Sequence, residues 1–140
     1  MRFWDSSALV PLFLDEPRSS SVHALFEHDP RLMVWWASRV ECTSAMARAA
    51  RDGRLDMPSK ELARERRAEL FDGADEIAPG EEVRARAERL LALHPLRAGD
   101  ALQLGAAIIW ARERTVGQAL VSLDERLREA ARKEGFSVLP

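Results

Sequence analysis

Hydrophobic positions follow two spacings that alternate from one segment of the chain to the next. Short apolar runs have the length of buried strands, and the longer segments between them repeat apolar residues with the period of an amphipathic helix. The predicted strands cover residues 2–4, 31–36, 75–78, 118–122 and 136–139. The predicted helices cover residues 8–14, 19–28, 38–51, 58–71, 81–93, 96–112 and 124–134. Strands and helices therefore alternate over most of the chain.

This alternation is typical of α/β proteins, in which helices cover both faces of a parallel sheet. Residues 96–112 are apolar on nearly every side, which indicates a helix buried in the interior. We therefore predict a three-layer α/β/α sandwich around a mainly parallel sheet of four to five strands. The length favours a single domain that spans residues 1–140.

Composition narrows the class of protein but does not name its function. Of the 140 residues, 46% are hydrophobic and 31% are charged, as in globular proteins, and no apolar run approaches the roughly 20 residues that a membrane helix needs. The sequence shows no signal-peptide pattern, and its single cysteine, Cys42, excludes an internal disulfide. We therefore expect a cytoplasmic protein without membrane contact.

Three acidic residues stand where a structural role would explain them. Asp5 follows the first predicted strand and is placed to cap the next helix. Glu41 stands three residues after Ser38, which is the spacing of a capping box. Asp124 lies in the first turn of a predicted helix, where the helix dipole favours a carboxylate, and Ser122 begins a second capping-box pattern there. Taken singly, each of the three is interpreted as a cap.

Asp100 differs because it lies on a stripe that should face the core. The residues four, seven and eight positions further on are Leu104, Ala107 and Ile108. A buried carboxylate is costly unless a cation, a hydrogen-bond donor or a ligand lies beside it. We therefore expect such a partner next to Asp100.

Taken together, the four carboxylates predict a metal site. Asp5, Glu41 and Asp124 all follow strands, and Asp100 begins a buried helix, so they should meet at one edge of a parallel sheet. Crowded carboxylates repel one another unless a positive charge compensates them, and oxygen ligands suit Mg²⁺ or Mn²⁺. One or two such ions can activate a water molecule and stabilise the charge at a phosphodiester. The cluster therefore predicts hydrolysis of a phosphate ester.

The sequence lacks the motifs that other classes of enzyme would require. It contains no glycine-rich phosphate loop, no Asp-x-Asp after the first strand and no Gly-x-Ser-x-Gly. The histidines His23, His28 and His94 do not have the spacing of metal ligands. A site built from carboxylates is therefore the interpretation we retain.

Four segments together have the pattern of one known family: residues 5–10 (DSSALV), 40–45 (VECTSA), 94–104 (HPLRAGDALQL) and 121–127 (VSLDERL). On these segments the chain resembles PIN-domain proteins over essentially its whole length, and more narrowly the VapC-type toxins of bacterial toxin–antitoxin pairs. The resemblance implies an α/β/α sandwich with Mg²⁺- or Mn²⁺-dependent endoribonuclease activity on structured cellular RNA. It also implies a homodimer that a cognate antitoxin protein neutralises.

The resemblance assigns roles to particular residues. The acidic, metal-binding site of the family falls on Asp5, Glu41, Asp100 and Asp124. Ser6 is the small polar residue beside the first aspartate, and Ser122 is a supporting polar residue near Asp124. Because the last acidic position varies within the family, Glu125 is an alternative to Asp124.

We therefore predict a metal-dependent endoribonuclease in which Asp5, Glu41 and Asp100 hold the metal. Asp124 completes the site or binds a second ion. Arg48 and Arg51, in a segment rich in basic residues, are candidates for contact with the RNA backbone. Two alternatives stay open: a non-catalytic interaction module with the same fold, and a metal-dependent nuclease that acts on DNA.

Overall fold

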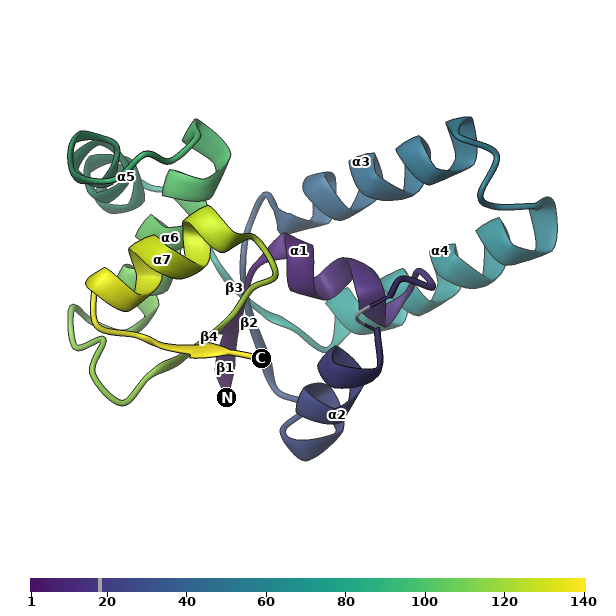
Figure 1. The fold of residues 1–140 in the computed structure, drawn as a ribbon, viewed down its shortest axis with the longest axis horizontal. Helices are drawn as coiled ribbons and strands as arrows, with labels where there is room; N and C mark the ends of the chain where they lie inside the picture. Colours follow the sequence, from purple (N-terminus) through teal and green to yellow (C-terminus); the bar gives the residue numbers. More distant parts are fainter. Residues whose placement is uncertain (18) are drawn as a thin grey trace.

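The computed structural model describes residues 1–17 and 19–140, and within them the chain forms one parallel sheet (Figure 1). The strands are β1 (Arg2–Trp4), β2 (Leu32–Trp35), β3 (Asp75–Ile77), β4 (Ala119–Val121) and β5 (Ser137–Leu139). Their order across the sheet is β3-β2-β1-β4-β5, and all four pairings are parallel. Because β1 lies in the centre, its carboxyl end is flanked by those of β2 and β4.

The helices agree in type with those predicted, and their ends differ by a few residues at most. They are α1 (Ser6–Leu9), the 3₁₀ turn η1 (Val10–Leu12), α2 (Ser19–His28), α3 (Ser38–Arg51), α4 (Met57–Asp72), α5 (Glu81–Leu93), α6 (Ala98–Trp110) and α7 (Glu125–Lys133). The predicted helix 8–14 instead begins at Ser6 and tightens into η1. Pro11 explains the change, because proline has no N–H to continue the α-helical ladder.

The sheet separates two hydrophobic cores, as a three-layer sandwich requires. Successive residues of a strand point to opposite faces. Phe3 packs with α5, α6 and α7 on one face, whereas Trp4 packs with α1 to α4 on the other. Figure 1 shows these two groups of helices on either side of the sheet. The predicted fold class is therefore confirmed, with five strands in the sheet.

Helix α6 is the buried helix that its apolar sequence predicted. Ala101, Leu104, Ala106 and Ala107 are completely buried. Gly105 lets α6 approach α5 closely, because a Cβ atom at this position would lie 3.1 Å from the backbone oxygen of Val83. This packing fixes the position of the first turn of α6, which carries Asp100.

Helices α3 and α4 form a hairpin that extends away from the sheet (Figure 1). Only Ala63 and Phe71 of α4 are buried, whereas Met57 and Leu62 are 76% and 46% exposed. None of the helices in the described part of the chain is both long and apolar enough to span a membrane.

Candidate active site

Asp5 lies at the carboxyl end of the central strand and at the start of α1. Its backbone N–H donates to the Val121 carbonyl at 2.9 Å, which extends the pairing of β1 with β4. Its Oδ2 atom accepts hydrogen bonds from the Ser7 N–H at 3.2 Å, the Ser7 hydroxyl at 2.5 Å and the Ser122 hydroxyl at 2.9 Å. Asp5 is thus the N-cap that its position predicted, and it is also part of a wider polar network.

The environment of Asp5 makes its charge costly. The residue is only 5% exposed, and this burial raises its pKa to about 6, from an ordinary value of 3.8. The hydrogen bonds from Ser7 and Ser122 oppose this rise, and the neighbouring Glu41 carboxylate adds to it. Near neutral pH the ionised Asp5 therefore gains from any cation that reaches it.

Glu41 takes part in tertiary contacts and does not form the predicted capping box. The N-cap of α3 is Ala37, so Ser38 is the first helical residue. Glu41 is the fourth, one position beyond the third residue that a capping box requires. Its Oε2 atom accepts hydrogen bonds from the Ser6 hydroxyl and from Nε2 of Gln103, the latter at 2.6 Å. The capping-box interpretation of Glu41 was therefore wrong.

Asp100 lies in the first turn of α6, and Asp124 is the N-cap of the neighbouring helix α7. Asp100 accepts a hydrogen bond from the Arg97 N–H at 3.4 Å, and Asp124 caps α7 by accepting from the Leu127 N–H at 2.9 Å. Burial raises the pKa of Asp100, and Asp124 raises it further, whereas Arg97 and Arg126 lower it. The cap at α7 is Asp124 and not Ser122, so the second predicted capping box was also wrong.

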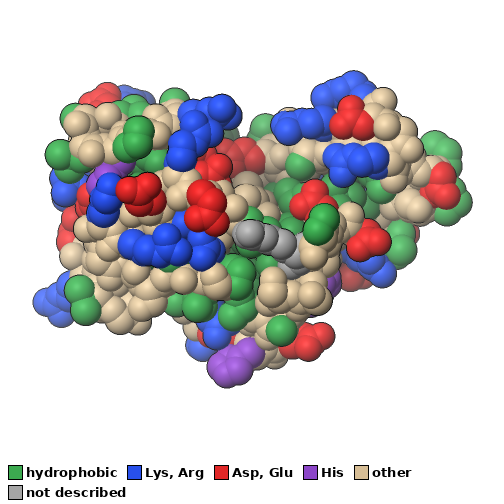
Figure 2. Space-filling view, viewed as in Figure 1, with side chains coloured by type: hydrophobic (Ala, Val, Ile, Leu, Met, Phe, Trp, Pro, Cys, Tyr) green, Lys and Arg blue, Asp and Glu red, His purple; other side chains and the backbone are tan. Residues whose placement is uncertain are grey.

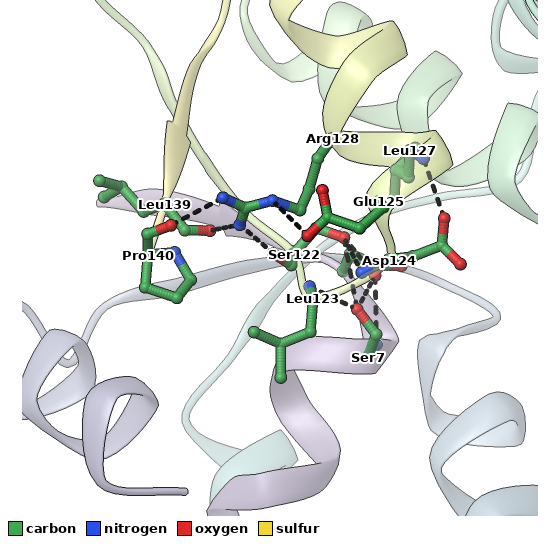
Figure 3. Close-up of polar contacts among 10 residues, drawn as sticks. Ser7, Ser122, Leu123, Asp124, Glu125, Leu127, Arg128, Leu139 and Pro140 are labelled. Atoms are coloured by element: carbon green, nitrogen blue, oxygen red, sulfur yellow. Dashed lines mark hydrogen bonds and ion pairs between the residues drawn. The ribbon is translucent and has the colours of Figure 1, made fainter. Parts of the chain in front are cut away.

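Figure 3 shows the contacts that Ser122 makes beside the N-cap of α7. Its hydroxyl lies in the network around Ser7, while its carbonyl accepts a hydrogen bond from Nη1 of Arg128 at 2.6 Å. Arg128 also donates to the carbonyls of Leu139 and Pro140, at 3.1 and 2.8 Å, and is only 8% exposed. Arg128 therefore links the end of β5 to the turn that carries Ser122.

The four predicted acidic residues lie at the same edge of the sheet, but as two pairs. Asp5 and Glu41 interact electrostatically, and so do Asp100 and Asp124. The pairs are neighbours, since a Cβ atom on Gly99 would lie 3.6 Å from Oε1 of Glu41. Within residues 1–17 and 19–140, however, no three acidic, histidine or cysteine side chains form a ready-made metal cage. The four carboxylates were predicted to meet at one point, and in this conformation they form two neighbouring pairs instead.

Each of the four carboxylates uses only one of its two oxygen atoms within the described residues. The engaged atoms are Oδ2 of Asp5, Oε2 of Glu41, Oδ2 of Asp100 and Oδ1 of Asp124. The second oxygen of each accepts no hydrogen bond from the described residues. Four oxygen atoms are therefore left to bind a ligand, and their chemistry suits a hard divalent cation.

Among the described residues, the arginines that act electrostatically on Asp100 are not Arg48 and Arg51. Arg48 and Arg51 are exposed in the last turn of α3, about 10 and 15 Å along the helix from Glu41. In Figure 2, basic side chains lie over α3, and acidic side chains lie in the notch beside α5 to α7 together with further basic ones. Arg97 and Arg126 instead act electrostatically on Asp100.

Sequence reasoning also missed Gln103, Ser7 and Arg128. A glutamine three positions after Asp100, inside an apolar helix, was a usable signal for Gln103. Ser7 is contained in the Asp5-Ser6-Ser7 segment, but its link to Ser122 joins residues 115 positions apart. No local pattern distinguishes Arg128 from the exposed arginines of the chain.

Comparison with known proteins identifies the family. The model of the PIN domain family matches residues 2–133, so the chain belongs to this family, whose members are typically nucleases and usually bind Mg²⁺. No curated protein sequence matches the chain. The fold is similar to that of PAE2754 from Pyrobaculum aerophilum, with a TM-score of 0.67 and 19% identity over 98% of this chain and 89% of that one. It is also similar to FitAcB from Neisseria gonorrhoeae, with a TM-score of 0.67 and 14% identity over 100% of this chain and 97% of that one.

We predict that Asp5 makes the stability of the metal-free protein depend on pH. Its pKa is about 6 in the folded protein and 3.8 for an ordinary aspartate, so between these values the folded state holds a proton that the unfolded state has lost. The free energy of unfolding in EDTA should therefore fall as the pH rises from 4 to 6, by up to about 3 kcal/mol, and then level off. Denaturation of the parent and of Asp5→Asn across this range tests the prediction, and the variant should lose most of this slope.

Asp56→Asn is the matched control for that measurement. Asp56 caps α4 on the surface, and its hydrogen bonds with Ser59 lower its pKa, so it contributes a slope of the opposite sign. Asp56→Asn should leave the fall between pH 4 and 6 in place. An Asp5→Asn protein that keeps the parental slope would show that Asp5 is not the group responsible.

Proposed function

We propose that this chain is a Mg²⁺- or Mn²⁺-dependent endoribonuclease that hydrolyses RNA phosphodiester bonds, and that it is the toxin of a toxin–antitoxin pair. The observation that carries the proposal is the set of four carboxylates at one edge of the sheet, each with one oxygen held by the protein and one left over. Membership of the PIN domain family supports the nuclease class. The toxin role rests on the resemblance to VapC-type proteins and on the likeness in fold to FitAcB.

The donor set fits a hard divalent cation. Asp5 and Glu41 repel one another, and no arginine or lysine of the described residues forms an ion pair with either. Oxygen ligands favour Mg²⁺ or Mn²⁺ over Zn²⁺, which prefers nitrogen and sulfur. When bound, such an ion would stabilise charge on the phosphate and activate the attacking water. Asp5, Glu41 and Asp100 are the residues that would hold it, and Asp124 would complete the site.

The protein groups around the carboxylates have separate tasks in this proposal. Ser7 and Ser122 hold Asp5, and Ser6 holds Glu41, so that the remaining oxygen atoms keep a defined direction. Near neutral pH, a divalent cation would compensate the charge of the buried, ionised Asp5 carboxylate, whose pKa is raised to about 6. Arg97 and Arg126 lie where they can bind the phosphate groups of the RNA. Arg48 and Arg51 would contact the RNA backbone further from the site.

The first test is Asp100→Asn. We expect metal-dependent RNA cleavage to fall by roughly 100-fold or more, since several kcal/mol of charge stabilisation would be lost. The variant should be as stable as the parent in EDTA, or more stable, because an amide removes the repulsion from Asp124 and can still accept from the Arg97 N–H. Mn²⁺ should raise the melting temperature of the parent and hardly change that of the variant.

Asp52→Asn is the control for this experiment, because Asp52 is exposed at the far end of α3. It should behave as the parent in every assay. A parallel assay with DNA separates the alternatives: cleavage of DNA but not RNA would contradict the ribonuclease proposal. A parent that cleaves neither with Mn²⁺ would favour a non-catalytic interaction module.

A second test concerns the arginines. Substituting both Arg97 and Arg126 by Gln should weaken RNA binding and lower the slope of log affinity against log salt by about 1.4, if each binds one phosphate of a single strand. The matched pair is Arg48→Gln with Arg51→Gln, which should have a smaller effect on kcat/KM. If the α3 pair has the larger effect on kcat/KM, the RNA runs over the hairpin and the roles we assign to Arg97 and Arg126 are wrong.

The proposed partners are a cognate antitoxin and a second copy of the chain. Helix α4 presents Met57 and Leu62 to solvent, and the start of α3 presents Val40, which is 65% exposed. Apolar surface of this kind is often covered in an oligomer. We expect light scattering of the purified chain at tens of micromolar to give the mass of a dimer, and a monomeric mass would count against the proposed assembly.

A further inference from the structure

Gln103 is a buried polar residue in the most apolar helix of the protein. It is 1% exposed and lies one turn after Asp100 on α6. Its Nε2 atom donates to Oε2 of Glu41 at 2.6 Å and to Oγ of Ser6 at 2.7 Å, and Oγ of Ser38 lies 3.2 Å away. The side chain therefore joins α1, α3 and α6 at the point where the candidate site is built.

The hydrogen bonds give the amide and the carboxylate a defined direction. The Ser6 hydroxyl donates to the same Oε2 atom of Glu41 that receives Gln103, so Ser6 Oγ is free to accept the second amide hydrogen. Reversing the amide would place its oxygen against the Glu41 carboxylate, and two acceptors cannot form a hydrogen bond with each other. The other carboxylate oxygen, Oε1, faces the start of α6, since a Cβ atom on Gly99 would lie 3.6 Å from it.

Packing alone does not account for an amide at position 103. Its Oε1 atom is buried and has no hydrogen-bond partner among the described residues. A buried carbonyl without a donor is unfavourable, and an unbranched apolar side chain such as Met would fill the same space without that cost. The unsatisfied Oε1 atom therefore indicates that the hydrogen bonds of the NH₂ group have a functional role that outweighs the cost of burying this oxygen.

We propose that Gln103 is a positioning residue that sets which oxygen of Glu41 is available to a divalent cation. By holding Oε2, together with Ser6, it leaves Oε1 directed toward the first turn of α6, where Asp100 begins the second carboxylate pair. This inference rests on the proposed metal-dependent function. Gln103 itself contacts neither cation nor substrate, and it acts through Glu41.

The test compares Gln103→Met with the parent in two measurements. In EDTA the variant should stay folded and melt only slightly below the parent, because it loses the hydrogen bonds to Glu41 and Ser6 but also removes the unsatisfied amide oxygen. Calorimetric titration with Mn²⁺ should show about 10- to 100-fold weaker binding, the usual loss when the group that orients a metal ligand is removed. Leu104→Met is the matched control: it changes a fully buried side chain on the same helix and should leave Mn²⁺ affinity unchanged.

A double variant separates positioning from packing. Ser6→Ala removes the other donor to Oε2, so Ser6→Ala with Gln103→Met should lose less affinity than the product of the two single losses, since both donors hold one atom. If Gln103→Met binds Mn²⁺ as tightly as the parent, or melts well below the parent with unchanged affinity, Gln103 is only scaffold. If the parent itself binds no Mn²⁺, the proposed function fails and this inference fails with it.

Discussion

Repulsion between carboxylates, at an edge where water is partly excluded, is the constraint on which the candidate site depends. A parallel sheet brings the ends of β1, β2 and β4 together, and the chain places an acidic residue at or within the helix that follows each of them. Asp5 is the most affected, because burial and Glu41 both raise its pKa. The fold therefore keeps an arrangement that costs stability when no cation is present.

Within the described residues, Asp5 and Glu41 are bound by neutral hydrogen-bond donors. Hydroxyl groups of Ser6, Ser7 and Ser122 and the amide of Gln103 bind the engaged oxygens of Asp5 and Glu41. Such donors fix the direction of a carboxylate without neutralising it, so its attraction for a cation is kept. An arginine in the same place would have formed a stable ion pair and competed with a metal.

Most of the fold could be predicted from the sequence, because strand and helix periodicities are local. Local periodicity correctly predicted the strand 2–4, the helix 81–93 and the buried helix that begins near Asp100. The positions of Asp5 and Asp124 at helix starts could be predicted for the same reason. Both expected capping boxes failed, however, because Ser38 and Ser122 use their hydroxyls in contacts across the fold. Gln103 and Arg128 were missed because their partners lie on other elements of the fold or across a turn.

The central claim is that the unused carboxylate oxygens at this edge hold a divalent cation. Anomalous diffraction from crystals of the protein grown with Mn²⁺ tests it most directly, because the signal locates the ion without an activity assay. The account predicts the strongest peak within coordination distance of the free oxygens of Asp5 and Glu41, with Asp100 turned toward it. A peak elsewhere, for example at the His94 and Glu134 pair at the C-terminal ends of α5 and α7, with none at the carboxyl edge at saturating Mn²⁺, would contradict it.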